Sequence, residues 1–424
     1  MLSRLAKMKV IPSEQHGFCL GASTTTQLVD STFDWTTALS NKNSVDIIYL
    51  DLSKAFDKVS HIKLLSKIAN LGISTQVLMW LKDYLSKRHM YVKVGYDYSD
   101  RFSCHSGVPQ GGVLSPLLFI VYCYDLPDGL KTHPNVKIQI YSDDINIYGN
   151  YNEQSKDEVH SAVSESLRRM VDWANSHGIP INLNKSTVFH IGKSFSGEYS
   201  VNGTILIKSN LAKDLGVLFD SRMQFTNLID HITKKALSTL FTILRNVHTN
   251  DQHVLLRLYK SYVLPHLEYC SQIWNPHTKK LQRKVERVQQ IFTRILFYRT
   301  ATNLLPSLPS YKIGLKHLSL QSLLYRRVFN YLSFCFRILR LHTKLRASKY
   351  WGFRISRART GGLGLYCKGI STVSNNIIFN TFFRRGARWM NMLRLNIVNS
   401  ANLATFKKKL RKLDLLRLLK MEDY

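Results

Sequence analysis

Acidic residues are scarce in the last third of this 424-residue chain. The whole sequence holds 59 Lys and Arg against 28 Asp and Glu, a formal net charge of +31. From Lys279 to the end there are 31 bases and only 4 acids, whereas the first 278 residues hold 28 bases and 24 acids. A folded region this poor in acids attracts polyanions. RNA or DNA is therefore its expected partner, with an anionic lipid surface as the main alternative.

Cysteine pairs and long apolar runs are also missing. The six cysteines include no Cys-x-x-Cys pair, which argues against a zinc knuckle and against a disulfide framework. No apolar run approaches the roughly 18 residues of a membrane span. Residues 1–10 mix bases with single apolar residues and so lack the apolar core of a signal peptide. We expect an intracellular protein with no membrane partner.

Two adjacent acids stand out in residues 136–148, which read as two strands joined at Asp143 and Asp144. Like charges placed side by side in a packed region repel each other, and each needs a counter-charge or water. A divalent cation would remove that cost. The alternative is an ordinary solvated turn, because Asp is a common turn former.

A third acid, Asp51, ends the apolar, β-branched run 45–50 just before a turn and a helical pattern. Carboxylates from two strand ends can converge on Mg²⁺, which prefers hard oxygen ligands. Two such ions would clamp the attacking and leaving oxygens of a phosphoryl transfer. Between the two acid-bearing stretches lies a glycine-rich turn, residues 106–112, which opens a helix. The three blocks in this order are a strong signal, whereas the Asp-Asp pair alone is weak.

These blocks resemble those of the reverse transcriptases, and most closely those of non-LTR retrotransposons. Asp51 stands where the family has its first catalytic aspartate. Residues 109–111, Pro-Gln-Gly, match its nucleotide-binding turn, and residues 141–144, Tyr-Ser-Asp-Asp, match its Tyr-x-Asp-Asp box. The resemblance covers about residues 16–220 and extends more loosely to about residue 296.

The resemblance implies an α+β fold. We expect a right-hand polymerase palm, an antiparallel sheet with packed helices, together with partial fingers, a helical thumb and a basic, mostly helical C-terminal domain. The expected domains are a remnant of the fingers at 1–44, the palm at 45–220, the thumb at 221–300, and a nucleic-acid-binding region at 301–424.

The resemblance also implies the site. Mg²⁺ or Mn²⁺ would be the cofactor, held by Asp51, Asp143 and Asp144 as catalytic residues. The partners would be an RNA template, a DNA primer and dNTPs, and the location would be the nucleus. The family pattern assigns nucleotide binding to Phe56, Gln110, Gly111 and Lys185, and the primer grip to Leu215 and Gly216. Alternatives remain for two of these residues, because Phe56 also fits an ordinary core position and Lys185 a surface turn.

A basic helix is expected at residues 279–297. Its bases alternate with apolar residues at helical spacing, as in a thumb helix that follows a duplex. A solvated charged face is the alternative, which the presence of a single acid, Glu286, weakens. The candidate nucleic-acid-binding residues are Lys279, Lys280, Arg283, Lys284 and Arg287. Further along, Trp351, Phe353 and Trp389 lie near arginines; core packing is the expected role, and stacking on unpaired bases is the alternative.

Two departures from the family bear on activity. In the loop at residues 14–27, Cys19 and Ala22 stand where arginines are frequent, and only about 15 residues precede this loop, where the family has most of its fingers. We therefore expect an N-terminally truncated enzyme that also lacks an endonuclease domain. Two functions stay open: an RNA-directed DNA polymerase that adds dNTPs to a primer 3′-hydroxyl by two-metal phosphoryl transfer, or an inactive remnant that folds and binds RNA.

Overall fold

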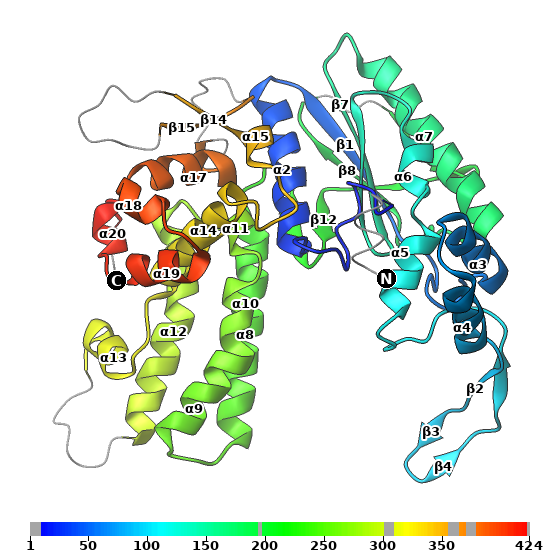
Figure 1. Cartoon of the computed structure of the whole chain (residues 1–424). Coiled ribbons are helices and arrows are strands. Elements are labelled where there is room, and N and C mark those ends of the chain that lie inside the picture. Colours follow the sequence, from blue (N-terminus) through cyan, green and yellow to red (C-terminus); the bar gives the residue numbers. More distant parts are fainter. Residues whose placement is uncertain (1–9, 194–196, 301–308, 355–363, 370–378, 422–424) are drawn as a thin grey trace. The chain divides into compact units, whose positions relative to one another are not determined.

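The chain divides into two compact units (Figure 1). Unit 1 holds residues 1–27 and 42–210, and unit 2 holds residues 28–41 and 211–424. Each unit has a hydrophobic core of its own. The computed structural model describes all residues except 1–9, 194–196, 301–308, 355–363, 370–378 and 422–424.

A five-stranded sheet with the order β11-β8-β1-β7-β6 forms the centre of unit 1. Its strands are β1 (Ser44–Leu50), β6 (Val136–Tyr141), β7 (Asp144–Tyr151), β8 (Thr187–Ile191) and β11 (Ile207–Ser209). β1 pairs with β7 on one side and β8 on the other, and every residue of it except Tyr49 is buried. The apolar, β-branched sequence of the predicted strand at 45–50 is therefore that of a central strand.

The expectation of a purely antiparallel sheet was wrong, because β11 runs parallel to its neighbour β8. The other pairings in the sheet are antiparallel. Between β8 and β11 the chain makes a separate two-stranded ribbon, β9 (Ser200–Val201) with β10 (Thr204–Ile205). After this ribbon the chain enters β11 in the same direction as β8, so the sheet contains both parallel and antiparallel pairs.

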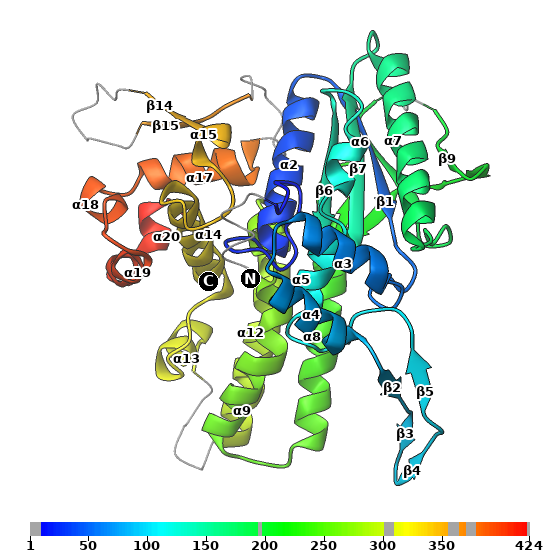
Figure 2. The ribbon, with the colours of Figure 1, turned by 45° about the vertical axis from the view of Figure 1, so that its right-hand side comes forward.

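The described residues of unit 1 also form helices that pack with the sheet (Figure 2). They are α3 (His61–Asn70), α4 (Thr75–Leu85), α5 (Ser115–Tyr122), α6 (Leu126–Leu130) and α7 (Lys156–His177). The apolar spacing of residues 61–85 predicts two short helices interrupted near Gly72, and this is confirmed, since Gly72 has a φ of 64° between α3 and α4. The spacing of residues 157–176 predicts a helix that stops at Gly178, which is confirmed by a left-handed C-cap at φ 70°.

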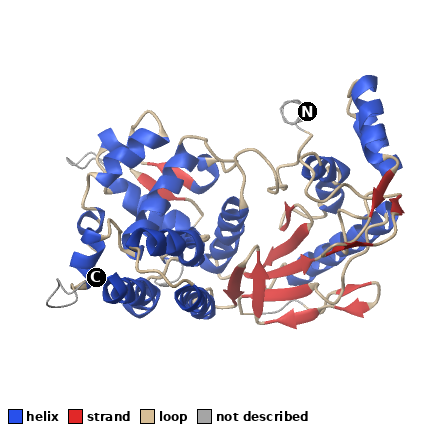
Figure 3. Cartoon of the chain, turned by 90° about the horizontal axis from the view of Figure 1, so that it is seen from below, coloured by secondary structure: helices blue, strands red, loops and turns tan. Residues whose placement is uncertain are grey.

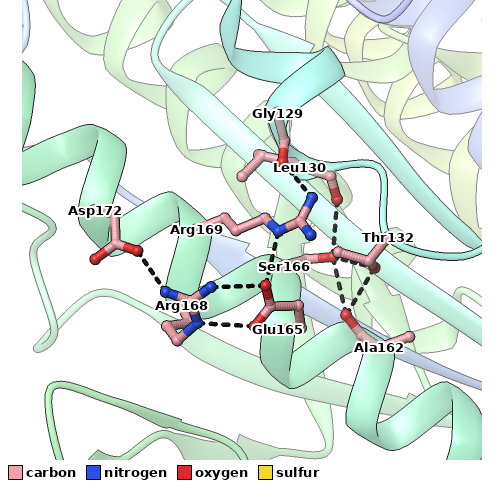
Figure 4. Close-up of polar contacts among 9 residues, drawn as sticks. All are labelled: Gly129, Leu130, Thr132, Ala162, Glu165, Ser166, Arg168, Arg169 and Asp172. Carbon is pink, nitrogen blue, oxygen red and sulfur yellow. Dashed lines mark hydrogen bonds and ion pairs between the residues drawn. The ribbon is translucent and has the colours of Figure 1, made fainter.

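Helix α7 is held by a buried hydroxyl on one face and carries ion pairs on the other (Figure 4). The Ser166 hydroxyl donates to the Leu130 carbonyl at 2.9 Å and lies 2.8 Å from the Thr132 hydroxyl, which fixes α7 to the end of α6. On the exposed face Arg168 and Arg169 both bind Glu165 at 2.8 Å. These hydrogen bonds lower the pKa of Glu165 to about 2. Because the pairs are exposed, water screens them and they add little stability.

A narrow arm projects from unit 1 between α4 and α5 (Figures 1 and 2). It pairs β2 (Arg88–Met90) with β5 (Phe102–Cys104) and, nearer the tip, β3 (Lys93–Val94) with β4 (Asp97–Tyr98). The sequence at residues 91–94 and 101–104 predicts a hairpin here. A hairpin is present, but its pairing differs, because residues 93–94 pair with 97–98 and residues 102–104 pair with 88–90.

Unit 2 is mostly helical, with only short strands among its described residues (Figure 3). It opens with the hairpin β12 (Leu211–Asp214) and β13 (Val217–Asp220). Apolar residues at helical spacing predict helices at residues 229–244, 254–267 and 279–297, and the structure confirms helices there. They form α8 (Thr226–Asn246), α9 (Gln252–Leu258), a π turn (Tyr259–Val263), α10 (Leu264–Glu268), α11 (Ser271–Trp274) and α12 (Lys279–Thr300).

The rest of unit 2 is built around α14 (Leu323–Leu339), which packs against α17 (Phe382–Asn391) and α19 (Leu403–Arg411). The smaller elements are α13 (Tyr311–His317), α15 (Ala347–Tyr350), β14 (Trp351–Phe353), β15 (Leu365–Cys367), α18 (Leu395–Val398) and α20 (Leu415–Leu418). No helix among the described residues is both long and apolar enough to cross a lipid bilayer.

Helix α2 (Thr24–Ser40) belongs mainly to unit 2, although its sequence lies before β1. The Phe33 ring meets the rings of Tyr350 and Phe383 edge to face, with centroids 5.0 and 5.1 Å apart. The Asp30 carboxylate accepts hydrogen bonds from Lys349 and from Tyr350 at 2.5 Å. The division between the two compact units thus falls near residues 27, 41 and 210, and the predicted domains at 1–44, 45–220, 221–300 and 301–424 stay a prediction.

Candidate active site and nucleic-acid interface

The turn between β6 and β7 presents two of the three candidate acids. Tyr141 pairs with Asp144, so Ser142 and Asp143 form the turn itself. Ser142 has a φ of 62°, a left-handed conformation in which a small polar residue is more easily accommodated than a β-branched one. The predicted hairpin with both acids at its tip is confirmed.

A buried glutamine holds this turn. Gln15 Oε1 accepts hydrogen bonds from the Ser142 amide at 3.0 Å and from the Gly17 amide at 2.7 Å. A Cβ on Gly17 would lie 2.5 Å from the Ser142 nitrogen, so only glycine fits there. Sequence reasoning missed Gln15; its place directly before the family-like His16-Gly17 pair was the available signal.

Asp51 follows β1 and lies next to the same turn. Its neighbour Leu50 pairs with Ile145, which places Asp51 at the level of Asp144 across the β1–β7 pair. The Lys185 ammonium lies 3.8 Å from the Asp51 carboxylate. The structure therefore brings Asp51, Asp143, Asp144 and Lys185 to one end of the central strands.

Burial and like charge disfavour the charged forms of the two hairpin acids. Burial raises the pKa of Asp143, and the charge of Asp51 adds to this rise. Burial raises the pKa of Asp144 to about 6, with further contributions from Asp143 and Asp51. Negative potential is thus concentrated at this end of the sheet, and a divalent cation would neutralise it.

The donor set fits a hard cation that also takes ligands from outside the chain. Among the described residues, no three His, Cys, Asp or Glu side chains are close enough together to form a metal-binding group on their own. Mg²⁺ is commonly held by one or two carboxylates together with waters and substrate phosphates. Asp51 and Asp143 suit that role, since both are partly buried acids at the same end of the sheet.

The glycine-rich turn is fixed to the segment after Asp51. The Val108 amide donates to the Phe56 carbonyl at 2.9 Å, and Gln110 Nε2 donates to Asp57 Oδ1 at 2.9 Å. Asp57 is therefore a further positioning residue, which sequence reasoning missed. Gly111 has a φ of 81° and open space where a Cβ would stand, so the turn needs its backbone freedom.

Phe56 packs on the core while keeping part of its surface exposed. Its ring stacks on the buried Phe119 ring, with centroids 4.5 Å apart and planes 17° apart. The structure thus brings Phe56 and Gln110 to the same turn, as the sequence predicts for a pocket. The stack equally suits an ordinary core residue, so the role in sugar selection stays a prediction.

In unit 2, Leu215 and Gly216 form the tip of the β12–β13 hairpin, with φ angles of 43° and 82°. The Tyr269 hydroxyl donates to the Leu215 carbonyl at 2.8 Å, and a Cβ on Gly216 would approach the Tyr269 ring to 3.3 Å. Tyr269 thus positions the tip that the sequence assigns to the primer grip. Nothing in the local sequence identifies this partner.

The basic helix α12 has an acid-free exposed face. Glu286 is buried and accepts hydrogen bonds from the Tyr311 hydroxyl and from the Leu323 and Leu324 amides. Lys284 pairs with Asp230 at 2.5 Å. The exposed bases spaced along one face of the helix are Lys280, Arg283, Arg287 and Arg294. The one acid of this segment therefore does not neutralise them. Nucleic-acid binding by this face stays a prediction, with a solvated charged face as its alternative.

The three aromatic residues near arginines differ in exposure. Trp351 and Trp389 are buried, with 2% and 8% of their surface exposed, which confirms core packing as their role. Phe353 is 64% exposed. Stacking on unpaired bases is therefore left to Phe353 alone.

The raised pKa of Asp144 predicts that Asp144→Asn stabilises the fold by an amount that depends on pH. A carboxyl whose pKa is higher in the folded chain destabilises the fold when charged, and this penalty disappears as the pH falls from about 6 toward its ordinary value. We expect the substitution to raise Tm by a few degrees at neutral pH, and the difference to vanish near pH 4. Neighbouring groups desolvate part of the Asp144 carboxyl, but the residue keeps enough contact with solvent for screening to keep the effect small. A calorimetric difference in Tm that does not change with pH, or a lower Tm for the variant, would contradict an unfavourable charge on Asp144.

Comparison with known proteins agrees with this geometry. The family described as "Reverse transcriptase (RNA-dependent DNA polymerase)" matches residues 1–237. The chain is 26% identical over 303 residues to a probable RNA-directed DNA polymerase from transposon X-element of Drosophila melanogaster, which covers 69% of this chain and 33% of that protein. It is 29% identical over 293 residues to the RNA-directed DNA polymerase from mobile element jockey of the same species, covering 66% and 31%.

The chain thus spans about a third of the length of the curated relatives it matches. Among solved structures, apo telomerase from Candida tropicalis aligns with a TM-score of 0.40 and 13% identity, covering 77% of this chain and 56% of the other. With a family match over more than half of its length, the chain belongs to the reverse transcriptases, and its curated relatives are enzymes of non-LTR retrotransposons.

Proposed function

We propose that the chain is an RNA-directed DNA polymerase that adds deoxynucleotides to a primer 3′-hydroxyl on an RNA template by two-metal phosphoryl transfer. The convergence of Asp51, Asp143 and Asp144 at one end of the sheet carries this proposal. The raised pKa values of Asp143 and Asp144 support it, because a bound cation would stabilise the charged carboxylates that burial and like charge disfavour. The names of the curated relatives support the choice of template and product.

The chemistry needs little from the protein beyond position and charge. Bound Mg²⁺ or Mn²⁺ would stabilise the charge that develops on the transferred phosphoryl group. Asp51 and Asp143 hold the ions in this proposal, and Asp144 adds negative potential beside them. Lys185, 3.8 Å from Asp51, supports the incoming triphosphate and is placed to protonate the leaving pyrophosphate. Phe56 and Gln110 shape the nucleotide pocket on the turn that Asp57 holds.

Template and primer binding fall to unit 2 in this proposal. The α12 face of Lys280, Arg283, Arg287 and Arg294 would contact phosphates, which fix a nucleic acid in place without reading its bases. Leu215 and Gly216, held by Tyr269, would support the primer end.

The first test is Asp143→Asn in a primer-extension assay on an RNA template with Mg²⁺ or Mn²⁺. Loss of one carboxylate removes several kcal/mol of charge stabilisation, so extension should fall by several orders of magnitude while the fold is kept. Asp83→Asn, on the exposed face of α4, is the matched control and should keep full activity.

A second readout makes this test independent of turnover. Mn²⁺ should raise Tm of the unsubstituted chain and leave Asp143→Asn unchanged. Near-normal extension by the variant would overturn the assignment. RNA binding with neither extension nor a Mn²⁺ effect in the unsubstituted chain would instead favour the inactive RNA-binding remnant.

Phe56→Val tests sugar selection. The aromatic ring would occupy the space that a ribose 2′-hydroxyl needs, so the smaller side chain should raise the ratio of kcat/KM for ribonucleotides over deoxynucleotides by at least ten-fold. Phe119→Leu disturbs the same ring stack from its buried side and serves as the control. If both variants shift the ratio equally, or neither does, Phe56 is an ordinary core residue.

The α12 face is tested by the combined substitution Arg283→Gln, Arg287→Gln and Arg294→Gln. The slope of log Kd against log salt should fall by about 0.7 to 0.9 for each phosphate that is no longer neutralised, so removing three arginines should reduce it by roughly two. A chain with Lys42, Lys82 and Lys193 changed to Gln, all exposed bases of unit 1, loses the same charge elsewhere and should keep the slope. Equal slopes for the two triple variants would show that α12 is not the phosphate-binding face.

A further inference from the structure

A groove of unit 2 lies beside the hairpin β14–β15, which is labelled in Figure 1. It holds about 1250 Å³ of empty space, including the open solvent inside it. Pockets for one small molecule hold roughly 300 to 1,000 Å³ and enclose most of that molecule, so an open groove of this size suits a segment of a polymer. Phe353 and Tyr366 line it from the two strands. Arg346 and Lys368 line it as well, and no lining residue is an acid.

Phe353 gives this groove an accessible aromatic ring. Trp351 lies two residues earlier on the same face of β14, and its indole donates a hydrogen bond to the buried Phe383 carbonyl at 2.8 Å. Phe353 is not held in this way. Its surface is 64% exposed, and its ring stacks on no other ring among the described residues. One exposed phenylalanine is ordinary on a protein surface, so the charges beside it decide what it can bind.

The cations of the groove have no acid beside them. Arg346 is exposed, and no side chain in the part of the chain that the structure describes pairs with it. Lys368 donates to the Ser348 carbonyl at 2.8 Å, a neutral acceptor that leaves the lysine charge uncompensated. Next to the groove, the Arg354 guanidinium lies 4.5 Å from the centroid of the Tyr366 ring. The positive potential of the groove is therefore available to an anion.

The sequence supplies no acid to this part of unit 2. After Glu286 the next acid along the chain is Asp414. Lys349, which does not line the groove, is paired with Asp30 of α2 and shows how a base in this region is neutralised where an acid is present. Uncompensated cations beside an exposed ring indicate a ligand that carries both repeated negative charge and flat rings.

We propose that this groove binds a segment of single-stranded nucleic acid, with one unpaired base stacked on the Phe353 ring and the flanking phosphates held by Arg346 and Lys368. Proteins that bind single strands without reading their sequence combine aromatic side chains for the bases with cations along the backbone. Inside a duplex both faces of a base are covered by its neighbours, so only an unpaired base can cover this ring. An anionic lipid surface also attracts cations, but a flat surface does not fill a groove.

The groove shares no residue with the catalytic acids or with the α12 face. The α12 face offers phosphate contacts, which a duplex and a single strand satisfy alike. The groove adds a preference for unpaired strand, and it needs neither a metal ion nor nucleotide addition. The inference therefore goes beyond the proposed polymerase and holds equally for an inactive chain that binds RNA.

Phe353→Leu in the full chain is the direct test. We would measure affinity, without metal ions or dNTPs, for a short oligouridine strand and for an RNA duplex of the same length. Loss of the ring should weaken binding of the single strand about ten-fold and leave duplex binding unchanged, because only an unpaired base stacks on the ring. Phe353→Tyr keeps a ring and should keep both affinities. Tyr96→Ala removes a 98% exposed ring from unit 1 and should also change neither.

The phosphate contacts are tested by Arg346→Gln combined with Lys368→Gln. For single strands the slope of log Kd against log salt falls by about 0.7 for each phosphate that is no longer neutralised, so this pair should reduce it by roughly 1.4. Lys42→Gln combined with Lys82→Gln removes the same charge from exposed positions of unit 1 and should keep the slope. Equal slopes for the two double variants would show that the groove does not hold the phosphates.

Two results with Phe353→Leu would overturn the groove as a single-strand site. One is an unchanged affinity for the single strand, and the other is an equal loss for strand and duplex. An unchanged strand affinity together with weaker binding to phosphatidylserine vesicles would assign the groove to a lipid surface instead. None of these results bears on the proposed polymerase, which Asp143→Asn tests in unit 1.

A crosslink on the unsubstituted chain decides the question even if Phe353→Leu does not fold. A strand that carries 5-bromouridine, irradiated in its complex with the protein, should become attached at Phe353. Mass spectrometry of the digested protein locates the attachment. Attachment only elsewhere in the chain would overturn the proposal.

Discussion

The candidate site of unit 1 depends on the placement of three carboxylates at one end of the central strands. Asp51, Asp143 and Asp144 lie at that end because β1 pairs with β7 in a register that aligns their ends. The fold alone does not stabilise charged carboxylates here, since burial and like charge raise the pKa of both hairpin acids. The tight turn at Ser142 and the buried Gln15 amide hold the acids where they repel. Acids whose charged forms are disfavoured in this way are expected where a cation and a phosphate are bound.

The sequence predicted the parts whose signals are local. For three elements the periodicity and the end signals lie within a few residues of one another. These are the apolar run at 45–50, the hairpin at 136–148 and the helix that ends at Gly178. The candidate acids were found for the same reason, because each lies at the end of a strand-like run. Strand ends that share a sheet edge meet in space, so pattern and register were enough to bring Asp51 to the Asp143–Asp144 turn.

The partners of these residues could not be predicted, because their contacts join distant parts of the chain. Gln15 reaches Ser142, Asp57 reaches Gln110, and Tyr269 reaches Leu215. Each is an ordinary polar residue in its own surroundings. Helix α2 is a similar case. The spacing of residues 28–39 predicts a helix, but only the packing of Phe33 on Tyr350 and Phe383 shows that it belongs to unit 2.

The same limit applies to charge, since the excess of bases after residue 278 does not say which of them are available to a polyanion. Arg326 is paired with Glu268, Lys349 with Asp30, and Lys284 with Asp230. These bases contribute to the core or to its surface contacts, and deleting residues 301–424 would also remove most of the hydrophobic cluster built around α14. The net charge after residue 278 therefore overestimates how many bases are available to bind a nucleic acid. Bases that are exposed and lie on an acid-free helix face are the ones whose counterions a nucleic acid can displace, because only these are free to exchange partners.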